Sequence, residues 1–440
     1  TPVRRLVRQR TPAPLASSLP ASLASDALGW SLLLAARVLA AVHGGKSLSE
    51  AMLLISGEAP VARAAAQDVA YGVLRRYSCA EFILSRLMSK PLTHVETEAL
   101  LHGALYRLES RADSGPMIVD QAVCAAGELA GGVFKGLVNG VLRNYLRQRE
   151  SLLAAMATDD EASNQHPRWW LARLRRAYPQ QWPSIVAAGN TAPPMTLRVN
   201  QRHTTSADYQ LSLERAGLMA RRIGLHGLVL DKPVTVDRLP GFHEGEISVQ
   251  DAGAQRAAEL LAPASGARVL DACAAPGGKT AHLLEAGELD LLALDIDAAR
   301  TRRIEDNLKR LGLRAELKVA DCSRPETWWD GRQFDAILAD VPCSASGVVR
   351  RHPDIKTLRR ESDIRRFAQV QATILDALWP LLKPGGKLLY ATCSVFTEEN
   401  SAQIDAFLVR QKCVERMLEE QLLPQDDNDG FYYALLRKTA

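Results

Sequence analysis

The chain lacks the cysteine spacings and the long apolar runs that several common protein classes require. Its seven cysteines are widely spread and form no Cys-x-x-Cys pair, which argues against a metal site such as zinc and against thioredoxin-type chemistry. A disulfide framework is not expected in a chain of 440 residues, so we expect a reducing, cytoplasmic location. No apolar run approaches the roughly 20 residues that span a bilayer, and we expect no membrane partner.

The chain also has little net charge. Its 54 lysines and arginines against 50 aspartates and glutamates give a net charge of +4, which is compatible with an RNA partner but does not demand one. Basic residues gather locally within 143–149, 168–176, 302–310 and 350–351. Any one of these clusters is typical of a solvated helix face, whereas the whole set favours phosphate contacts.

The glycine-containing turn at 271–280 fits neither the Gly-x-Gly-x-x-Gly fingerprint of dinucleotide dehydrogenases nor a Walker loop. Gly277 and Gly278 would still allow a ligand to approach the backbone closely. Acids end three successive predicted strands, at Asp271, Asp295 and Asp321. This pattern fits an adenosyl group without a pyrophosphate, such as S-adenosylmethionine, although each acid alone could cap the following helix.

What the chain does have is a pair of cysteines, Cys343 and Cys393, that follow two predicted buried strands. The apolar runs at 337–341 and 388–391 precede them. In an open parallel sheet, ligands bind at the carboxyl ends of the strands. Two thiols at two strand ends, beside a nucleotide-type loop, therefore indicate cysteine chemistry on a bound base.

The chain is predicted to be multidomain. Residues 1–25 are rich in Pro, Ser, Ala and Arg and are expected to be a disordered tail. Residues 26–160 carry apolar residues at helical spacing and predict an all-helical bundle, with Asp26 as the cap of its first helix. Residues 161–255 predict a small α/β unit. Residues 256–440 alternate strand and helix, which predicts an α/β domain with a parallel sheet covered on both faces.

Two strands in these regions carry further expectations. In the strand expected at 196–200, Leu197 and Val199 are predicted core residues, whereas Arg198 and Asn200 point the other way and could face RNA or solvent. The closing run 431–436 is predicted to be an antiparallel strand at the edge of the large sheet.

Several motifs resemble those of a known family, the Fmu/Sun bacterial 16S ribosomal RNA cytosine-C5 methyltransferases. They are Asp271–Thr280, Asp340–Ser344, Arg350–Asp354, Thr392–Ser394 and Asp429–Tyr433. In the helical region, Val119–Val123 and Phe134–Asn144 resemble the end of the NusB-like RNA-binding fold. The resemblance covers nearly everything after the tail. It implies an all-α NusB-like bundle, a small α/β middle domain and a C-terminal Rossmann-like class I methyltransferase domain that uses S-adenosylmethionine.

The resemblance also implies roles for individual residues. Cys393 is expected to add to carbon 6 of cytosine, and Cys343 is expected to assist release of the enzyme. Asp340 is expected to hydrogen-bond the cytosine edge, and Lys279 is a candidate for activating a thiol. The residues expected to bind S-adenosylmethionine are Cys273, Ala274, Ala275, Pro276, Gly277, Gly278, Lys279, Asp295, Asp321 and Asp340.

The implied substrate is an unpaired or extruded cytosine of 16S ribosomal RNA, cytosine 967 in the usual numbering of that RNA, bound by a monomeric protein. Arg198 and the pair Arg350 and Arg351 are candidate RNA contacts. Trp169 and Trp170 are further candidates, although tryptophans in such a segment are also typical of a core.

The chain departs from the family pattern at Val341, Ser346 and Cys322, and the last of these leaves the adenine contact of Asp321 open. Three other functions stay open. The first is a transfer RNA cytosine-C5 methyltransferase. The second is a methyltransferase of an exocyclic amine or a protein group, which typically requires [DN]-P-P-[YF] at 340–343. The third is a non-catalytic RNA-binding assembly factor, against which the two intact cysteines argue.

Overall fold

The computed structural model describes residues 23, 24 and 26–439 of the chain. These residues form two compact units. The first runs to Ala172 and also takes in Val349–Arg359, and the second comprises Arg173–Val348 and the residues from Arg360 onwards. The expected tail lies outside the described residues except at positions 23 and 24, and the expected domain boundaries near 160 and 255 stay predictions.

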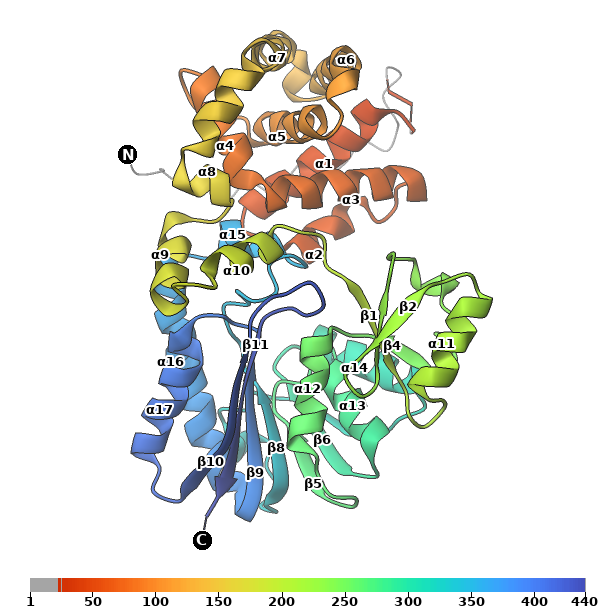
Figure 1. The fold of residues 1–440 in the computed structure, drawn as a ribbon, viewed down its shortest axis with the longest axis vertical. Helices are drawn as coiled ribbons and strands as arrows, with labels where there is room; N and C mark the ends of the chain where they lie inside the picture. Colours follow the sequence, from red (N-terminus) through yellow and green to blue (C-terminus); the bar gives the residue numbers. More distant parts are fainter. Residues whose placement is uncertain (1–22, 25, 440) are drawn as a thin grey trace. The chain divides into compact units, whose positions relative to one another are not determined.

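The first unit is a bundle of helices, as predicted (Figure 1). Helix α9 (Arg168–Ala177) begins in this unit and ends in the other. The other helices are α1 (Leu28–His43), α2 (Leu48–Met52), α3 (Pro60–Arg75), α4 (Tyr77–Leu87), α5 (Val95–Ser110), α6 (Gly115–Gly127), α7 (Lys135–Ala157), α8 (Asp160–Asn164) and α15 (Ile355–Leu358).

Helix α1 lies at the centre of the bundle, in contact with α3, α5 and α6. Leu32, Leu34 and Ala35 point to different sides of this helix, and all three are buried. A helix that is apolar on every side is stable only inside a core. The prediction that Asp26 caps α1 is wrong, because the helix begins after Ala27, whose methyl side chain accepts no hydrogen bond.

One segment of the first unit comes from far along the chain. Residues 349–359, here called the strap, lie in sequence between the two cysteine motifs but pack with the helical bundle. Asp354 Oδ2 accepts a hydrogen bond from the backbone N–H of Leu48 at 2.9 Å, and Lys356 Nζ donates to the carbonyl oxygen of Arg75 at 2.8 Å. The loop that carries Cys343 therefore continues directly into a segment that the bundle holds.

Replacing Asp354 by alanine is expected to lower the stability of the helical unit. The substitution leaves the buried N–H of Leu48 without its acceptor, which costs about 1–3 kcal/mol. Thermal denaturation followed by circular dichroism measures the loss. The matched control is Asp354→Asn, whose amide oxygen can still accept, so its midpoint should lie close to that of the wild type. Equal destabilisation by both variants would contradict this role for the strap.

The second unit contains a small four-stranded antiparallel sheet in the order β2-β3-β1-β4. Leu197 and Val199 are buried as predicted, against Tyr209 and Leu213 of the helix on that face. The strand β2 was not foreseen. The elements are α10 (Trp182–Gly189), β1 (Met195–Val199), α11 (Ser206–Arg215), β2 (Ala220–Ile223), β3 (Gly227–Leu230) and β4 (Ile247–Val249).

The other face of this small sheet is covered as well, and this corrects two expectations. Arg198 is fully buried and its guanidinium pairs with the carboxylate of Glu285, at 2.8 and 2.7 Å. Asn200 is buried, and its side-chain amide donates to the carbonyl of Gly245. Neither side chain lies at a surface that RNA could reach. The alternation of the strand placed both correctly on the second face, but that face packs against protein.

Two of the other expected RNA contacts are also buried. Arg350 and Trp170 are only 2% and 1% exposed, so neither offers its side chain to a nucleic acid. Trp169 and Arg351 are half-buried. The reading of Trp170 as a core residue is therefore confirmed.

The second unit also contains a seven-stranded sheet in the order β10-β11-β9-β8-β5-β6-β7. The strands from β9 to β7 are parallel, as predicted, and β11 and β10 are antiparallel. The strands are β5 (Arg268–Asp271), β6 (Asp290–Asp295), β7 (Glu316–Val319), β8 (Phe334–Asp340), β9 (Leu382–Thr392), β10 (Val414–Leu422) and β11 (Phe431–Lys438).

Helices cover both faces of this sheet (Figure 1). Apolar residues of α16 and α17, such as Leu375, Leu378 and Phe407, pack on one face with the strands. The helices of the opposite face contact β8, β9, β11, β6 and β7. The helices are α12 (Ala252–Leu261), α13 (Gly278–Ala286), α14 (Ala298–Arg310), α16 (Glu361–Leu378) and α17 (Ser401–Arg410).

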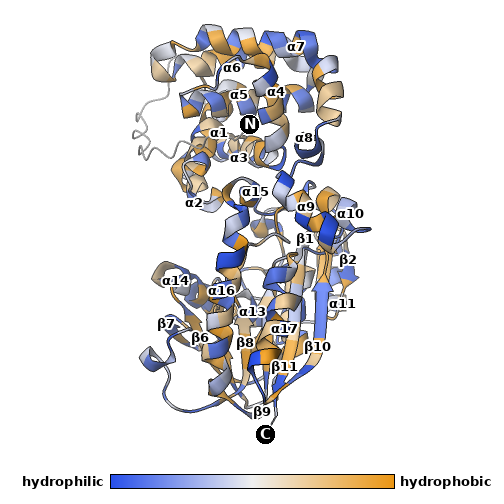
Figure 2. Ribbon diagram, turned by 90° about the vertical axis from the view of Figure 1, so that its left-hand side faces the viewer, coloured by the Kyte–Doolittle hydropathy of each residue, from blue (hydrophilic) through white to orange (hydrophobic). Residues whose placement is uncertain are grey.

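The prediction that 431–436 forms an edge strand is wrong. β11 is antiparallel, but β10 pairs with its far side and takes the edge. Figure 2 shows β10 largely in the hydrophilic colour, and most of its residues are at least partly exposed. Charged side chains are typical of an edge strand, since they discourage pairing with another chain. The low apolar content of 414–422 concealed this strand in the sequence.

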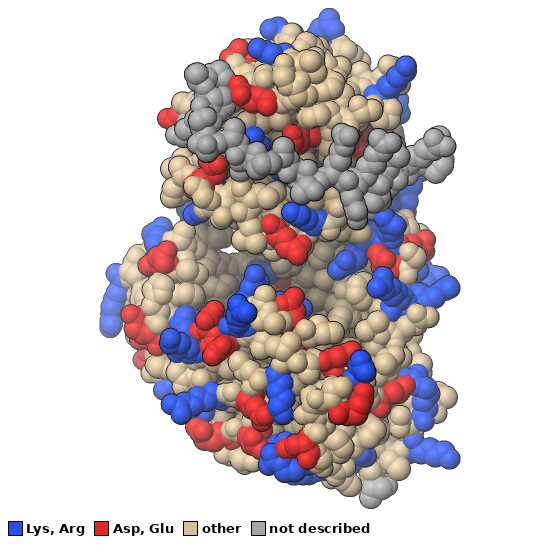
Figure 3. All heavy atoms as spheres, turned by 180° about the vertical axis from the view of Figure 1, so that it is seen from behind, with Lys and Arg blue, Asp and Glu red and all other residues tan. Residues whose placement is uncertain are grey.

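Among the described residues, no helix is long and apolar enough to cross a membrane. Lysines and arginines are interspersed with aspartates and glutamates over the face drawn in Figure 3.

Candidate functional site

The two cysteines meet at the carboxyl ends of neighbouring strands. β8 and β9 are parallel, with Asp340 opposite Ala391, so the residues that follow both strands emerge together. The sulfur atoms of Cys343 and Cys393 lie 3.4 Å apart, and both residues are partly exposed. The sequence could place each thiol at a strand end, and the adjacency of these two strands brings the thiols into one site.

A charged pair completes this group. Lys279 Nζ donates to Asp340 Oδ2 at 2.6 Å, and the ammonium lies 5.4 Å from the ring centre of Phe431. Burial lowers the pKa of Lys279, but the carboxylate of Asp340 more than offsets this effect, so the pKa lies above its ordinary value. Lys279 is therefore a fixed cation in this site at neutral pH. The four residues with expected catalytic roles are thus neighbours in the second unit.

The two thiols differ in their charged surroundings. The pKa of Cys343 is raised well above its ordinary value by its hydrogen bond with Cys393, by burial and by the carboxylate of Glu399. Cys393, in contrast, is one of the groups whose charge acts on the ammonium of Lys279. A nearby cation favours a thiolate, whereas a nearby anion favours the neutral thiol. Burial and the carboxylate of Glu399 therefore help to keep the proton on Cys343, whereas Cys393 has the cation of Lys279 as an electrostatic partner.

The loop after β5 has the features of a ligand-binding turn. Gly277 has φ +94°, and a Cβ added there would lie 3.0 Å from Cγ2 of Ile304. A side chain at this position would be strained and crowded. Asp271 is buried below the loop, where its Oδ2 accepts from Thr280 at 2.7 Å and its Oδ1 has no partner among the described residues. Burial raises the pKa of Asp271 to about 7.

The acids expected at the next two strand ends are also present at this edge of the sheet. The Oδ atoms of Asp295, the last residue of β6, accept from the backbone N–H groups of Asp297 and Ala275. Asp321 lies two residues beyond β7, where its Oδ1 accepts from Ser323. Ile296 was missed in the sequence, but it directly follows Asp295 and is 69% exposed. The exposed side chain of Ile296, next to Asp295, offers an apolar surface on which an aromatic ring can lie.

The remaining expected loop residues surround the same turn. Ala274 and Ala275 are buried, and the carbonyl of Ala275 accepts from Arg300 at 2.9 Å. Pro276 is exposed. The sulfur of Cys273 lies 3.7 Å from that of Cys322, so the departure from glycine after Asp321 is accommodated by a thiol contact with the loop. The structure thus brings the expected cofactor-binding residues of this loop together around one turn.

Sequence reasoning missed Glu399, which lies directly behind the cysteines. It is fully buried and bonded to both serines that follow the thiols, Ser344 and Ser394. Nothing in the spacing of a single sequence separates this glutamate from its neighbour Glu398, whose carboxylate pairs with arginines instead. Burial and hydrogen-bond partners, which the tertiary structure decides, distinguish the two.

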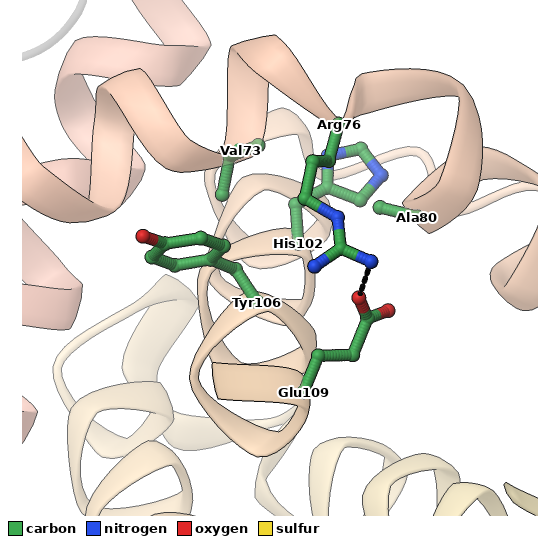
Figure 4. Close-up of a pocket in the computed structure, with 6 residues that line it drawn as sticks. All are labelled: Val73, Arg76, Ala80, His102, Tyr106 and Glu109. Atoms are coloured by element: carbon green, nitrogen blue, oxygen red, sulfur yellow. Dashed lines mark ion pairs between the residues drawn. The ribbon is translucent and has the colours of Figure 1, made fainter. Parts of the chain in front are cut away.

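A small cavity in the helical unit is not a second ligand site (Figure 4). It holds about 10 Å³, which is room for roughly one water molecule. The guanidinium of Arg76 and the carboxylate of Glu109, which line it, already form an ion pair at 2.5 Å. The four described residues with expected catalytic roles belong to the other unit.

Comparisons with known proteins agree over most of the chain. Family models match at 258–437 (16S rRNA methyltransferase RsmB/F), 166–237 (Methyltr_RsmF/B-like, ferredoxin-like domain) and 31–147 (NusB family). The ribosomal RNA small subunit methyltransferase B of Vibrio cholerae is 45% identical over 407 residues, which cover 90% of this chain and 94% of that protein. The protein of the same name from Erwinia tasmaniensis is 46% identical over 387 residues, which cover 84% of this chain and 90% of that protein.

A solved structure supports the same fold. The crystal structure of the protein named PH0851 has a TM-score of 0.79 and covers 94% of this chain and 99% of its own. Its sequence is 23% identical, so the likeness concerns the fold alone. The NusB-like bundle, the small α/β middle domain and the Rossmann-like methyltransferase fold expected from the sequence are confirmed, and the middle domain matches a ferredoxin-like family model.

Proposed function

The chain belongs to the 16S rRNA methyltransferase RsmB/F family, and we propose that it methylates carbon 5 of one cytosine in 16S ribosomal RNA, cytosine 967 in the usual numbering. The observation that carries the choice of atom is the thiol pair, with 3.4 Å between its sulfur atoms. Carbon 5 of cytosine is a poor nucleophile until a soft nucleophile adds to carbon 6. Methylation of an exocyclic amine needs no such thiol.

Cys393 is the proposed nucleophile. Its thiolate adds to carbon 6, which makes carbon 5 enamine-like and able to take a methyl group. A free thiol is only a few per cent ionised at neutral pH, so a neighbouring cation is useful. Lys279 supplies that cation, and its charge is maintained by Asp340.

Cys343 and Asp340 have the complementary proposed roles. After transfer, the proton on carbon 5 must be removed so that the bond from carbon 6 to sulfur can break. Cys343 lies against the nucleophile and assists this release as a neutral thiol. Water takes the proton from carbon 5, and the electron pair of the carbon–sulfur bond returns to Cys393. The Oδ1 atom of Asp340, which is not the oxygen bonded to Lys279, can accept from the protonated cytosine edge.

S-adenosylmethionine supplies an electrophilic methyl group when it is bound. The fit of the β5 loop to this cofactor rests on the close approach at Gly277 and on the unpartnered buried oxygen of Asp271. Asp295 would hold the ribose, since its Oδ1 accepts one described N–H, from Asp297, and retains a second lone pair, while its Oδ2 faces Ala275 and Arg300. Asp321 and Ile296 would flank the adenine.

The other parts of the proposal concern the partner and the location. We assign 16S ribosomal RNA as the substrate because the matched relatives are named as small subunit ribosomal RNA methyltransferases. The NusB-like bundle is the proposed accessory RNA-binding domain. An enzyme acting on this RNA as a monomer in the cytoplasm is the simplest form of the proposal.

The proposal is tested with an unmodified 16S ribosomal RNA transcript and S-adenosylmethionine labelled in its methyl group. One 5-methylcytosine per transcript is expected. Bisulfite sequencing of RNA from a strain that lacks the protein should find the same cytosine unmodified. A transfer RNA pool serves as the competing substrate. Label in transfer RNA alone, or on a base other than cytosine, would refute the assignment.

A further inference from the structure

We infer that Glu399 is a positioning residue that fixes the distance and orientation between the two active-site thiols. The inference rests on the proposed function, since it concerns the same pair of cysteines. It starts from a dipeptide, Cys-Ser, that occurs at both active-site cysteines. A serine directly follows each cysteine, Ser344 after Cys343 and Ser394 after Cys393, and one carboxylate bonds both.

The contacts of Glu399 connect two loops that leave different strands. Oε1 accepts from the backbone N–H of Ser344 at 2.7 Å, and Oε2 accepts from the Oγ of Ser344 at 2.5 Å. Oε2 also accepts from the Oγ of Ser394 at 2.6 Å. The two hydroxyl oxygens are themselves only 3.2 Å apart. One rigid group thus fixes the residue after each thiol.

Glu399 is in turn held from behind. Gln371 of α16 donates to its Oε1 at 3.2 Å and to the carbonyl of Pro342 at 3.0 Å, which places a third link on the Cys343 loop. The hydroxyl of Tyr390, on β9, donates to the backbone carbonyl of Glu399 at 2.6 Å. The carboxylate therefore rests on a helix and a strand of the core.

The protein retains this glutamate despite an energetic cost. Burial disfavours the charged form of Glu399 and raises its pKa, while four donors favour that form. Burying a charge costs free energy unless it is paired and hydrogen-bonded, and Glu399 has hydrogen bonds but no ion-pair partner among the described residues. An active site needs its reacting groups fixed to within about half an ångström. Positioning of the two thiols explains why the carboxylate of Glu399 is buried behind them.

The test replaces Glu399 by glutamine in the full-length protein. Gln keeps the shape and one acceptor oxygen, and the serine hydroxyls can rotate to accept from its amide, so the fold should persist. The kcat for methyl transfer to the 16S transcript is expected to fall about 100-fold, the size of loss that a misplacement of roughly 1 Å produces. The KM for the transcript and the affinity for S-adenosylmethionine should change less than about threefold, since neither involves the thiols.

A second readout isolates the thiols from overall folding. The Cys343→Ala protein is expected to form a covalent RNA adduct that a denaturing gel detects. Adding Glu399→Gln to that protein should slow formation of the adduct. The matched control is Glu398→Gln, the same substitution one residue earlier, on a carboxylate that contacts neither serine. It should leave kcat within about twofold. If Glu399→Gln fails to fold, Ser344→Ala removes a single donor and should lower kcat in the same direction.

Full kcat in Glu399→Gln, together with normal adduct formation when Glu399→Gln is added to Cys343→Ala, would overturn the inference. Equal losses in both Glu variants would do so as well, because the effect would then be one of general stability. Absence of cytosine methylation by the wild-type protein is a separate result, which rejects the proposed function before the variants are compared.

Discussion

Replacement of Cys393 by alanine is expected to abolish methyl transfer, and replacement of Cys343 by alanine is expected to trap the protein on its RNA. Without the sulfur of Cys393, carbon 5 stays a poor nucleophile and no bond to RNA forms. Without Cys343, the bond from carbon 6 to sulfur forms but its release is slowed. Both substitutions replace a cysteine by alanine, and the two sulfur atoms that they remove lie 3.4 Å apart in the wild type. Opposite outcomes are nevertheless expected.

The measurement is a denaturing gel of protein mixed with the 16S transcript and S-adenosylmethionine, beside a count of transferred methyl groups. The Cys343→Ala lane should hold a slow-migrating adduct, and the Cys393→Ala lane should hold none. Cys413→Ala, at an exposed cysteine, is the control and should behave as the wild type does. An adduct that accumulates with Cys393→Ala instead would exchange the two roles.

Replacement of Arg198 by methionine is expected to lower the free energy of unfolding by about 3–5 kcal/mol, the usual cost of removing one partner from a buried ion pair. The guanidinium is fully buried and binds both oxygens of Glu285. It also donates to the carbonyl of Gly278, at 2.8 Å, in the proposed cofactor loop. The variant should therefore also bind S-adenosylmethionine more weakly, which isothermal titration calorimetry measures.

Urea denaturation measures the stability loss, and two further variants define its cause. Arg198→Met combined with Glu285→Leu removes both charges and should recover most of the stability, because no charge is then left buried alone. Arg437→Met breaks an exposed pair with Glu415 and should cost less than about 1 kcal/mol. A loss of under about 1 kcal/mol in Arg198→Met would show that Glu285 finds water when Arg198 is removed.

Deleting the bundle to test its role in RNA binding would also remove the packing around the strap, residues 349–359. Residues 349–359 would lose the elements that bury Ile355 and Lys356. Point substitutions on the exposed surface of the bundle are therefore the better test of RNA affinity, since they leave the strap in place.

The sequence alone determined the type of each domain and predicted the edge of the sheet at which the candidate site lies. Strand and helix alternate with distinct periods, so the parallel sheet could be predicted from 256 onwards. The carboxyl ends of parallel strands share one edge, and that rule placed Cys343, Cys393, Asp295 and the β5 loop near a common site.

The tertiary structure decided which surfaces are covered and which distant residues meet. Alternation along a strand sorts Leu197 from Arg198, but it cannot say whether the second face meets solvent or a buried glutamate 87 residues further on. In the same way, Leu48 meets Asp354 across 306 positions of the chain. Glu399 differs from Glu398 in being buried behind the thiols and in its hydrogen-bond partners. Local sequence fixes the direction of a side chain, while packing of distant elements fixes its partner.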